Sequence, residues 1–336
     1  MACAVMTPRP HDALFKSAFE TPAHAAALLR ALVPTTLGEL IAWDTLTGET
    51  GSFVDPRLAD RHSDLVFSAR LRAAPFSVIY VLLEHQSTGD PTMPLRTMSY
   101  EARIWHRFRK AYRATWLPPI LAVVISHVRG GWTTARTLAE LFDPAISACP
   151  ALAALAALVP RVPLIIEDLA HRSNADLRAW MLPAFPKLAL WLLRDARDPR
   201  RLLASFDTWI DSFAEVERAS GGSDAMTTLL TYLFRVVKPM HHDELRAKVR
   251  QLGPRAEEIT MSIVDMWHEQ GRAKGRQEGR VEGRIAALRR LILVKFGCQM
   301  LDDRYEAAIR NATLDALDGY LQRVLTADSV AAVFED

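Results

Sequence analysis

The sequence has few cysteines and lacks any long hydrophobic run. Its 336 residues include three cysteines, Cys3, Cys149 and Cys298, and no Cys-x-x-Cys pair. An odd number of scattered cysteines argues against a disulfide framework and against a zinc finger. The longest apolar runs, such as residues 151–159, fall well short of the ~18 residues that span a bilayer. The first residues show no charged start followed by an apolar stretch, which a signal peptide would have, so we expect a cytoplasmic protein without a membrane segment.

An excess of charge of one sign is also lacking. Lysine and arginine together number 41, against 39 aspartate and glutamate residues, which gives a formal net charge of +2. Contacts with nucleic acid must therefore come from local basic patches. No glycine-rich phosphate loop, serine nucleophile elbow or cysteine–histidine nucleophile pair stands out. Half of the residues are hydrophobic, which is ample for a core, and the length suits two or three domains.

Two strands that pair with each other are predicted in the first third of the chain. The runs 61–70 and 76–86 are both rich in β-branched and apolar residues. Residues 73–75 separate them, and the proline in this segment marks a turn. A hairpin centred on this turn would set Val66 opposite Leu82.

Two carboxylates would meet on one face of this hairpin. The same pairing sets Asp64 opposite Glu84, and directly opposed residues have Cβ atoms roughly 5 Å apart. Gln86 follows Glu84 on that face, whereas His85 points the other way. Adjacent carboxylates repel each other unless a proton or a cation lies between them, and a hard divalent cation such as Mg²⁺ takes oxygen ligands of this kind. The alternative is a pair of solvated carboxylates at wet strand ends.

Several blocks of residues in the first 145 positions occur in a characteristic order. The blocks are His11-Asp12-Ala13-Leu14-Phe15-Lys16, Phe19, Pro22, Leu28-Leu29, Leu32-Val33-Pro34, Arg61-His62-Ser63-Asp64-Leu65-Val66-Phe67, Tyr80-Val81-Leu82-Leu83-Glu84-His85-Gln86-Ser87, Met93, Arg96, Tyr100, Trp105 and Gly130-Gly131-Trp132. In this order they resemble the recombination-promoting nuclease family, also described as putative transposases, of the PD-(D/E)XK nuclease superfamily. The resemblance is looser in the rest of the chain.

The resemblance implies a fold, a reaction and a set of site residues. The fold would be an α/β restriction-endonuclease-like core, a mixed sheet flanked by helices. The reaction would be Mg²⁺-dependent cleavage of DNA, with Mn²⁺ or Ca²⁺ as substitutes for Mg²⁺. Asp64 and Glu84 match the two metal-binding acids of the superfamily, and the backbone carbonyl of His85 would be a further ligand.

Two positions depart from the superfamily signature. Ser63 replaces the proline before the first acid, and Gln86 replaces the lysine. That lysine orients the attacking water and stabilises developing charge, and glutamine does only the first of these well. The family resembled here commonly carries glutamine, so the resemblance is compatible with cleavage, including slow or restricted cleavage. Lys16, on the first predicted helix, could supply the missing charge, although a lone helical lysine is more often only solvated.

Residues 91–113 predict a long helix with a basic face. This face carries residues at spacings of 4, 3 and 4, namely Arg96, Tyr100, Arg103 and Arg107. A second, apolar face carries Trp105, Phe108 and Tyr112. We expect Arg96 and Tyr100, together with Lys16, to contact DNA phosphate beside the metal. An ordinary amphipathic helix with wet arginines is the alternative.

The chain is predicted to contain three regions: a nuclease core at residues 1–145, an α-helical extension at 146–260, and a Gly-Arg repeat helix with a small helical end at 261–336. The core pattern predicts a helix at 12–33, a strand near 52–54, the two paired strands, the helix at 91–113 and a buried strand at 120–126. After residue 133 only helices are predicted, at 134–142, 149–158, 174–192, 202–219, 223–234, 243–251 and 301–334.

A Gly-Arg pair recurs every four residues between positions 270 and 285. Glycine costs a helix about 1 kcal/mol relative to alanine, but it lets another backbone approach closely. An apolar seam follows at 4-3-4 spacing, Val281, Ile285, Leu288 and Ile292. We therefore expect a homodimer formed through the C-terminal helix, with a solvated linker helix as the alternative.

The sequence thus favours a Mg²⁺-dependent DNA endonuclease linked to recombination or mobile elements. Two alternatives stay open, a catalytically degenerate DNA-binding or scaffold protein and a transposase that also joins strands. The pairs His11-Asp12 and His241-His242-Asp243 would suit a metal phosphohydrolase, but nothing in the sequence brings them together.

Overall fold

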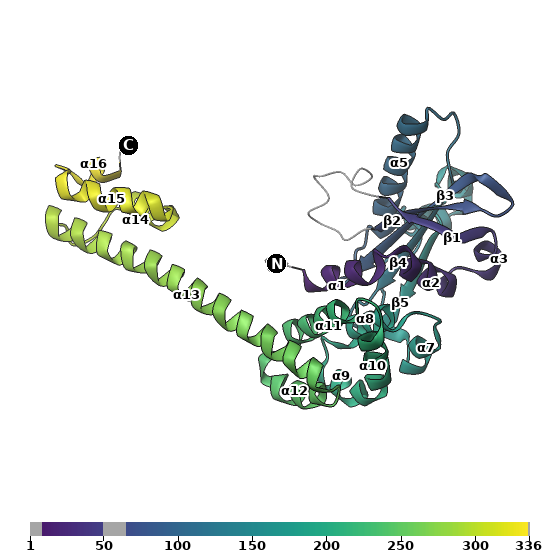
Figure 1. Cartoon of the computed structure of the whole chain (residues 1–336). Helices are drawn as coiled ribbons and strands as arrows, with labels where there is room; N and C mark the ends of the chain where they lie inside the picture. The colour runs from purple at the N-terminus through teal and green to yellow at the C-terminus, as the bar shows by residue number, and fades with distance from the viewer. Residues whose placement is uncertain (1–8, 50–64, 335–336) are drawn as a thin grey trace. The chain divides into compact units, whose positions relative to one another are not determined.

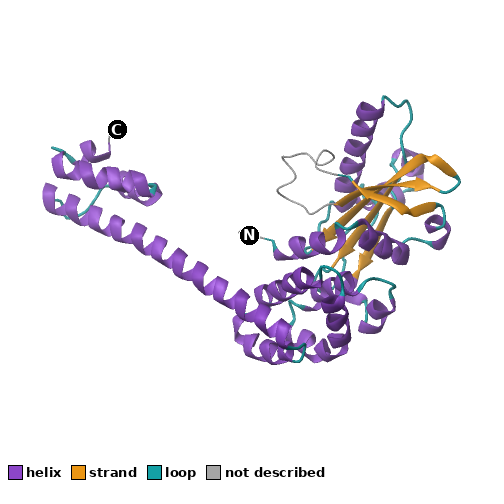
Figure 2. Cartoon of the chain, in the orientation of Figure 1, coloured by secondary structure: helices purple, strands orange, loops and turns teal. Residues whose placement is uncertain are grey.

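The chain divides into two compact units, residues 1–260 and 261–336. The computed structural model describes residues 9–49 and 65–334. The first unit contains a five-stranded sheet with helices on both sides, and the second is helical (Figures 1 and 2). The fold class predicted from the sequence, a mixed sheet flanked by helices and followed by a helical region, is confirmed. Within the described ranges each helix is too short or too polar to cross a bilayer.

The sheet is mixed, and its strands lie in the order of the sequence, β1-β2-β3-β4-β5. The strands are β1 (Ile41–Gly48), β2 (Leu65–Leu71), β3 (Ala74–Gln86), β4 (Ile120–Ser126) and β5 (Leu164–Asp168). The first three pair antiparallel, whereas β3 with β4 and β4 with β5 pair parallel. The carboxyl ends of β3, β4 and β5 therefore lie at one edge of the sheet.

The predicted pairing of β2 with β3 is confirmed, because Val66 lies opposite Leu82. The turn is tighter than expected, since Ala74 already belongs to β3. The outcome differs for other strands. The strand expected near 52–54 lies outside the described residues, and β1 was not predicted. The prediction that only helices follow residue 133 is wrong, because β5 adds to the sheet beside β4.

Several of the described helices of the first unit are shorter than the sequence pattern predicts. They are α1 (Pro10–Phe19), α2 (Pro22–Leu32), α3 (Thr35–Gly38), α5 (Met93–Tyr112), α6 (Pro144–Ala148), α7 (Asn174–Ala179), α8 (Ala184–Asp195), α9 (Pro199–Ser205), α10 (Ile210–Arg218), α11 (Gly222–Val236) and α12 (His242–Arg250). Five 3-10 helices join them within the described ranges, η1 (Leu138–Leu141), η2 (Pro150–Leu158), η3 (Leu169–His171), η4 (Phe206–Trp209) and η5 (Pro239–His241). The single helix expected at 12–33 is two helices, because Pro22 cannot continue α1 and begins α2 instead.

Helices cover the two faces of the sheet differently. On one face α5 packs against β2, β3 and β4 through a cluster that includes Leu82, Ile104 and Phe108. On the other face Phe15 of α1 stacks on His85 of β3, and α1 in turn contacts α8 and α11. The alternation of side chains along β3 thus directs Glu84 and Gln86 toward α5 and His85 toward α1.

The second unit consists of the greater part of α13 (Pro254–Phe296) and three short helices, α14 (Asp303–Asn311), α15 (Leu314–Thr326) and α16 (Val330–Phe334). Leu288 and Ile292 of the predicted seam are fully buried against these three helices. Val281 and Ile285 are partly buried against the same cluster. The seam expected to join two chains is therefore covered by the same chain.

Candidate active site

The candidate site lies at the carboxyl end of β3, at the edge where three parallel strands end. Glu84 is 1% exposed and Gln86, the last residue of β3, is 6% exposed. The amide nitrogen Nε2 of Gln86 donates a hydrogen bond to Oε1 of Glu84, with 2.8 Å between the two atoms. This bond leaves the carbonyl oxygen of the Gln86 side chain for another donor or for a cation.

Arg96, in the first turn of α5, contributes a cation to the site. Its guanidinium group forms an ion pair with Glu84, and its Nη1 lies 2.5 Å from Oδ2 of Asp90. A buried carboxylate is costly unless a charged partner and hydrogen bonds compensate it. Arg96 and Gln86 together provide that compensation for Glu84.

The second predicted acid, Asp64, lies outside the described residues. It directly precedes Leu65, which pairs with Leu83, and Glu84 directly follows Leu83. The Glu84 carboxylate and the Gln86 carbonyl are oxygen donors of the type that Mg²⁺ accepts, so the chemistry of these two residues fits such an ion. In the described part of the chain no three or more His, Cys, Asp or Glu side chains gather as a metal site.

His85 faces away from the Glu84 side of the sheet. Its Nδ1 lies 3.2 Å from Oδ1 of Asp12, and its ring stacks between Phe15 and His127. Burial lowers the pKa of His85, so the ring is neutral at pH 7. This leaves the backbone carbonyl as the part of His85 that could hold a metal, as the resemblance implies.

Lys16 and Tyr100, two of the three residues expected at DNA phosphate, differ in their surroundings from Arg96. Lys16 is exposed on α1, and α1 covers the face of the sheet opposite to Glu84. Tyr100 is buried in the cluster between α5 and the sheet, with the Arg103 guanidinium 5.9 Å from its ring centre. The buried face of α5 is therefore rotated by part of a turn from the predicted apolar face, since Tyr112 of the predicted face is 66% exposed.

The sequence pattern did not lead us to predict that Glu101 is buried. It is 4% exposed on α5, next to Tyr100, and burial raises its pKa to about 7. The signal was available, because the buried positions of α5 recur every three or four residues, at Thr97, Tyr100, Glu101, Ile104 and Phe108. The predicted basic face included Tyr100, which in fact belongs to the buried positions of this helix.

A histidine cluster behind β3 was also missed. The ring centres of His11 and His127 are 4.9 Å apart, and those of His85 and His127 are 4.7 Å apart. His11 Nδ1 lies 2.8 Å from the hydroxyl oxygen of Tyr232, and Arg197 Nη2 lies 3.1 Å from His127 Nδ1. These residues come from distant parts of the chain, so no sequence spacing could have indicated the cluster.

Comparisons with known proteins agree with the resemblance stated from the sequence. Residues 9–222 match the family model described as "Putative transposase, YhgA-like". Recombination-promoting nuclease RpnD of Escherichia coli O157:H7 is 36% identical over 121 residues, which are 36% of this chain and 46% of that protein. Recombination-promoting nuclease RpnA of E. coli K12 is 33% identical over 119 residues, or 35% of this chain and 40% of that protein.

One relative carries a different description. A protein of E. coli K12 named "Putative inactive recombination-promoting nuclease-like protein YjiP" is 40% identical over 98 residues, 29% of this chain and 94% of that protein. The chain spans less than half the length of RpnD and RpnA. No solved structure matches the chain.

Proposed function

This chain belongs to the family described as putative transposases, YhgA-like, and on that premise we propose that it is a metal-dependent DNA endonuclease linked to recombination. The observation that carries the proposal is the buried Glu84, held by Arg96 and Gln86 at the carboxyl edge of the parallel strands. The names of RpnD and RpnA support the reaction class. The substrate would be DNA, and the bond hydrolysed would be a phosphodiester.

The proposed metal is Mg²⁺, with Mn²⁺ or Ca²⁺ as substitutes. Asp64, Glu84 and the backbone carbonyl of His85 would hold it. When bound, the ion would neutralise charge on the phosphate and lower the pKa of water.

The other residues of the site would position the reactants. Gln86 would orient the attacking water through its side-chain carbonyl, while its nitrogen stays on Glu84. Arg96 would supply the positive charge that a lysine at position 86 would otherwise provide, because its guanidinium group already lies against Glu84. Lys16 is less suited to this part than Arg96, because it lies on α1, which covers the opposite face of the sheet.

A degenerate DNA-binding protein is the second candidate. The ion pair between Arg96 and Glu84 satisfies the carboxylate without a metal, and the name of YjiP describes an inactive relative. In this case Arg96 would hold the site closed to a divalent ion. DNA binding would then persist without cleavage.

Nicking of supercoiled plasmid separates these two functions. We expect the full-length chain to nick the plasmid with Mg²⁺ or Mn²⁺ and to lose this activity in EDTA. DNA binding without nicking in Mg²⁺, Mn²⁺ or Ca²⁺ would support the degenerate protein instead. A transposase that joins strands would in addition transfer an end-labelled oligonucleotide to the plasmid.

The homodimer stays a prediction. Because the seam is covered within one chain, a second copy would have to bind the exposed Gly-Arg repeat of α13. At Gly271, Gly275, Gly279 and Gly283 an added Cβ would meet no described atom within 4 Å beyond the adjoining residues and backbone of α13 itself. The repeat thus has room for a second backbone.

A further inference from the structure

A cavity of about 560 Å³ lies in the first unit beyond the ends of β4 and β5. The segment that follows β4 forms one side of it. The junction of α8 and α9 and the segment after α11 form the others. Most of its charged lining is basic: Arg129, Arg194, Arg197, Arg201 and Lys238, against the single carboxylate of Asp198.

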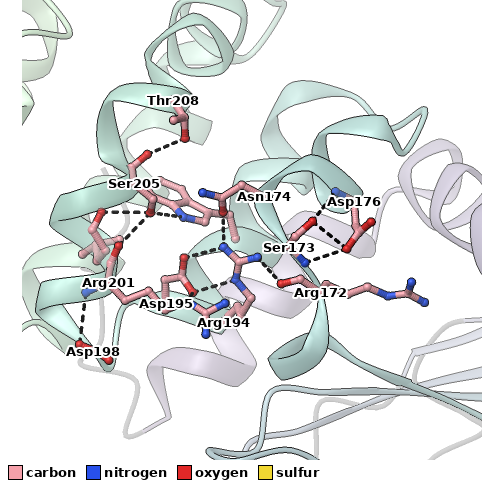
Figure 3. Close-up of polar contacts among 12 residues, drawn as sticks. Arg172, Ser173, Asn174, Asp176, Arg194, Asp195, Asp198, Arg201, Ser205 and Thr208 are labelled. Atoms are coloured by element: carbon pink, nitrogen blue, oxygen red, sulfur yellow. Dashed lines mark hydrogen bonds and ion pairs between the residues drawn. The ribbon is translucent and has the colours of Figure 1, made fainter.

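Two of these arginines are fixed by one buried carboxylate. Nη2 of Arg194 lies 2.6 Å from Oδ2 of Asp195, and Nε of Arg201 lies 2.8 Å from Oδ1 of the same residue. Figure 3 shows this group, in which Arg194 also bonds to Asn174 and to the carbonyl of Arg172. One side of the cavity is therefore a preorganised pair of guanidinium groups that shares one negative charge.

Arg197 carries a charge that no carboxylate compensates among the described residues. It is half-buried, and its guanidinium group bonds to the carbonyl of Ser87, at 3.2 Å, and to the carbonyl and Nδ1 of His127. Arg129 and Lys238 are exposed and likewise have no carboxylate within ion-pair distance in the part of the chain that is described. A half-buried cation bound only to neutral acceptors is costly, and an anion in the cavity would offset that cost.

We propose that this cavity is a phosphate-binding site, separate from the Glu84 site. Guanidinium groups bind phosphate oxygens through paired hydrogen bonds, and the volume is within the range of small-molecule pockets. Two sources would present the same chemistry. One is a backbone phosphate of bound DNA, because Arg197 bonds to Ser87, directly after Gln86. The other is a free phosphorylated compound such as a nucleotide.

Calorimetric titration of the full-length chain with inorganic pyrophosphate in EDTA tests the site. The test variant is Arg129→Ala with Lys238→Ala, since both side chains are exposed and their loss should leave the fold intact. The control is Arg200→Ala, which removes an exposed arginine of α9 that does not line the cavity. We expect the double variant to bind pyrophosphate at least tenfold more weakly and the control to bind as the wild type does.

Binding of a fluorescent DNA duplex in EDTA identifies the source. If pyrophosphate competes with DNA and the double variant loses DNA affinity, the cavity takes a backbone phosphate. If DNA affinity stays unchanged while pyrophosphate binding falls, the ligand is a free phosphate compound. The proposal is overturned if the wild type does not bind pyrophosphate, or if the double variant binds it as tightly as Arg200→Ala. Neither outcome depends on cleavage of DNA, so failure of this proposal can be distinguished from failure of the proposed nuclease function.

Discussion

Glu84 is a buried carboxylate whose charge is already shared between two neighbours. Arg96 pairs with it and also with Asp90, so the guanidinium group keeps one partner when it leaves the other. A cation that entered beside Glu84 would compete with Arg96 for the carboxylate. Arg96 and Gln86 therefore satisfy the Glu84 carboxylate without a metal, and under the proposed function Arg96 would yield this carboxylate to the incoming ion.

A substitution at position 86 tests whether a second positive charge beside Glu84 supports cleavage. Gln86→Lys would place an ammonium group where Nε2 now lies 2.8 Å from Glu84, and a lysine there restores the superfamily signature. We expect the plasmid-nicking rate of Gln86→Lys to equal or exceed that of the wild type. A collapse of the rate, with DNA binding and folding unchanged, would show that glutamine has a function that lysine cannot perform.

Glu101 should make stability depend on pH. Its pKa is raised from 4.5 to about 7 by burial, so between these values the folded chain holds a proton that the unfolded chain releases. The free energy of unfolding therefore falls as pH rises from 4.5 through about 7. Glu101→Gln removes this contribution. Relative to the wild type, the variant should gain on the order of 1–3 kcal/mol between pH 4.5 and pH 7.5.

Urea unfolding of both proteins at several pH values measures this difference. The buried histidines also make stability depend on pH, because burial lowers the pKa of His11, His85 and His127, but they are present in both proteins and cancel in the comparison. Parallel pH dependences would mean that Glu101 is ionised at its ordinary pKa.

At the scale of elements, sequence patterns predicted those parts of the fold that local chemistry determines. Helix α5 and strand β4 were predicted close to their observed bounds because turns or prolines flank them. The period of two along β3 correctly separated His85 from Glu84 and Gln86. Strand β5 was missed because its five residues follow alanine- and leucine-rich segments that favour helix.

Of the candidate site, the sequence predicted only the relation between residues of the same strand, β3. Gln86 and Glu84 share a face by spacing alone, but the bond between Arg96 and Glu84 depends on where α5 begins after the loop. The His11–Tyr232 contact joins residues 221 positions apart. Such contacts follow from tertiary packing, which a single sequence pattern does not contain.

The seam of α13 provides a test at the same scale. Leu288 is fully buried against α14, α15 and α16. Leu288→Ala should therefore destabilise the second unit by roughly 2–5 kcal/mol, the usual cost of such a truncation in a core. Its subunit number in light scattering should equal that of the wild type. If the variant changed from dimer to monomer with an unchanged unfolding transition, the seam would be an interface between chains after all.

At the scale of the whole molecule, the described site residues all belong to the first unit. The family match, residues 9–222, lies within the same unit. The second unit has its own apolar core around Leu288 and Ile292. Cleavage should accordingly depend on the first unit.

The most direct test of the proposed nuclease is the rate of plasmid nicking in Mg²⁺ by Glu84→Gln. Asp90→Asn is the matched control, because it removes the other carboxylate that Arg96 contacts. Loss of a residue that only supports a metal ligand costs about 10- to 100-fold, so loss of Glu84 itself should lower the rate by at least ~100-fold, while Asp90→Asn should retain most of it. A Glu84→Gln variant that nicks at the wild-type rate would contradict the assignment.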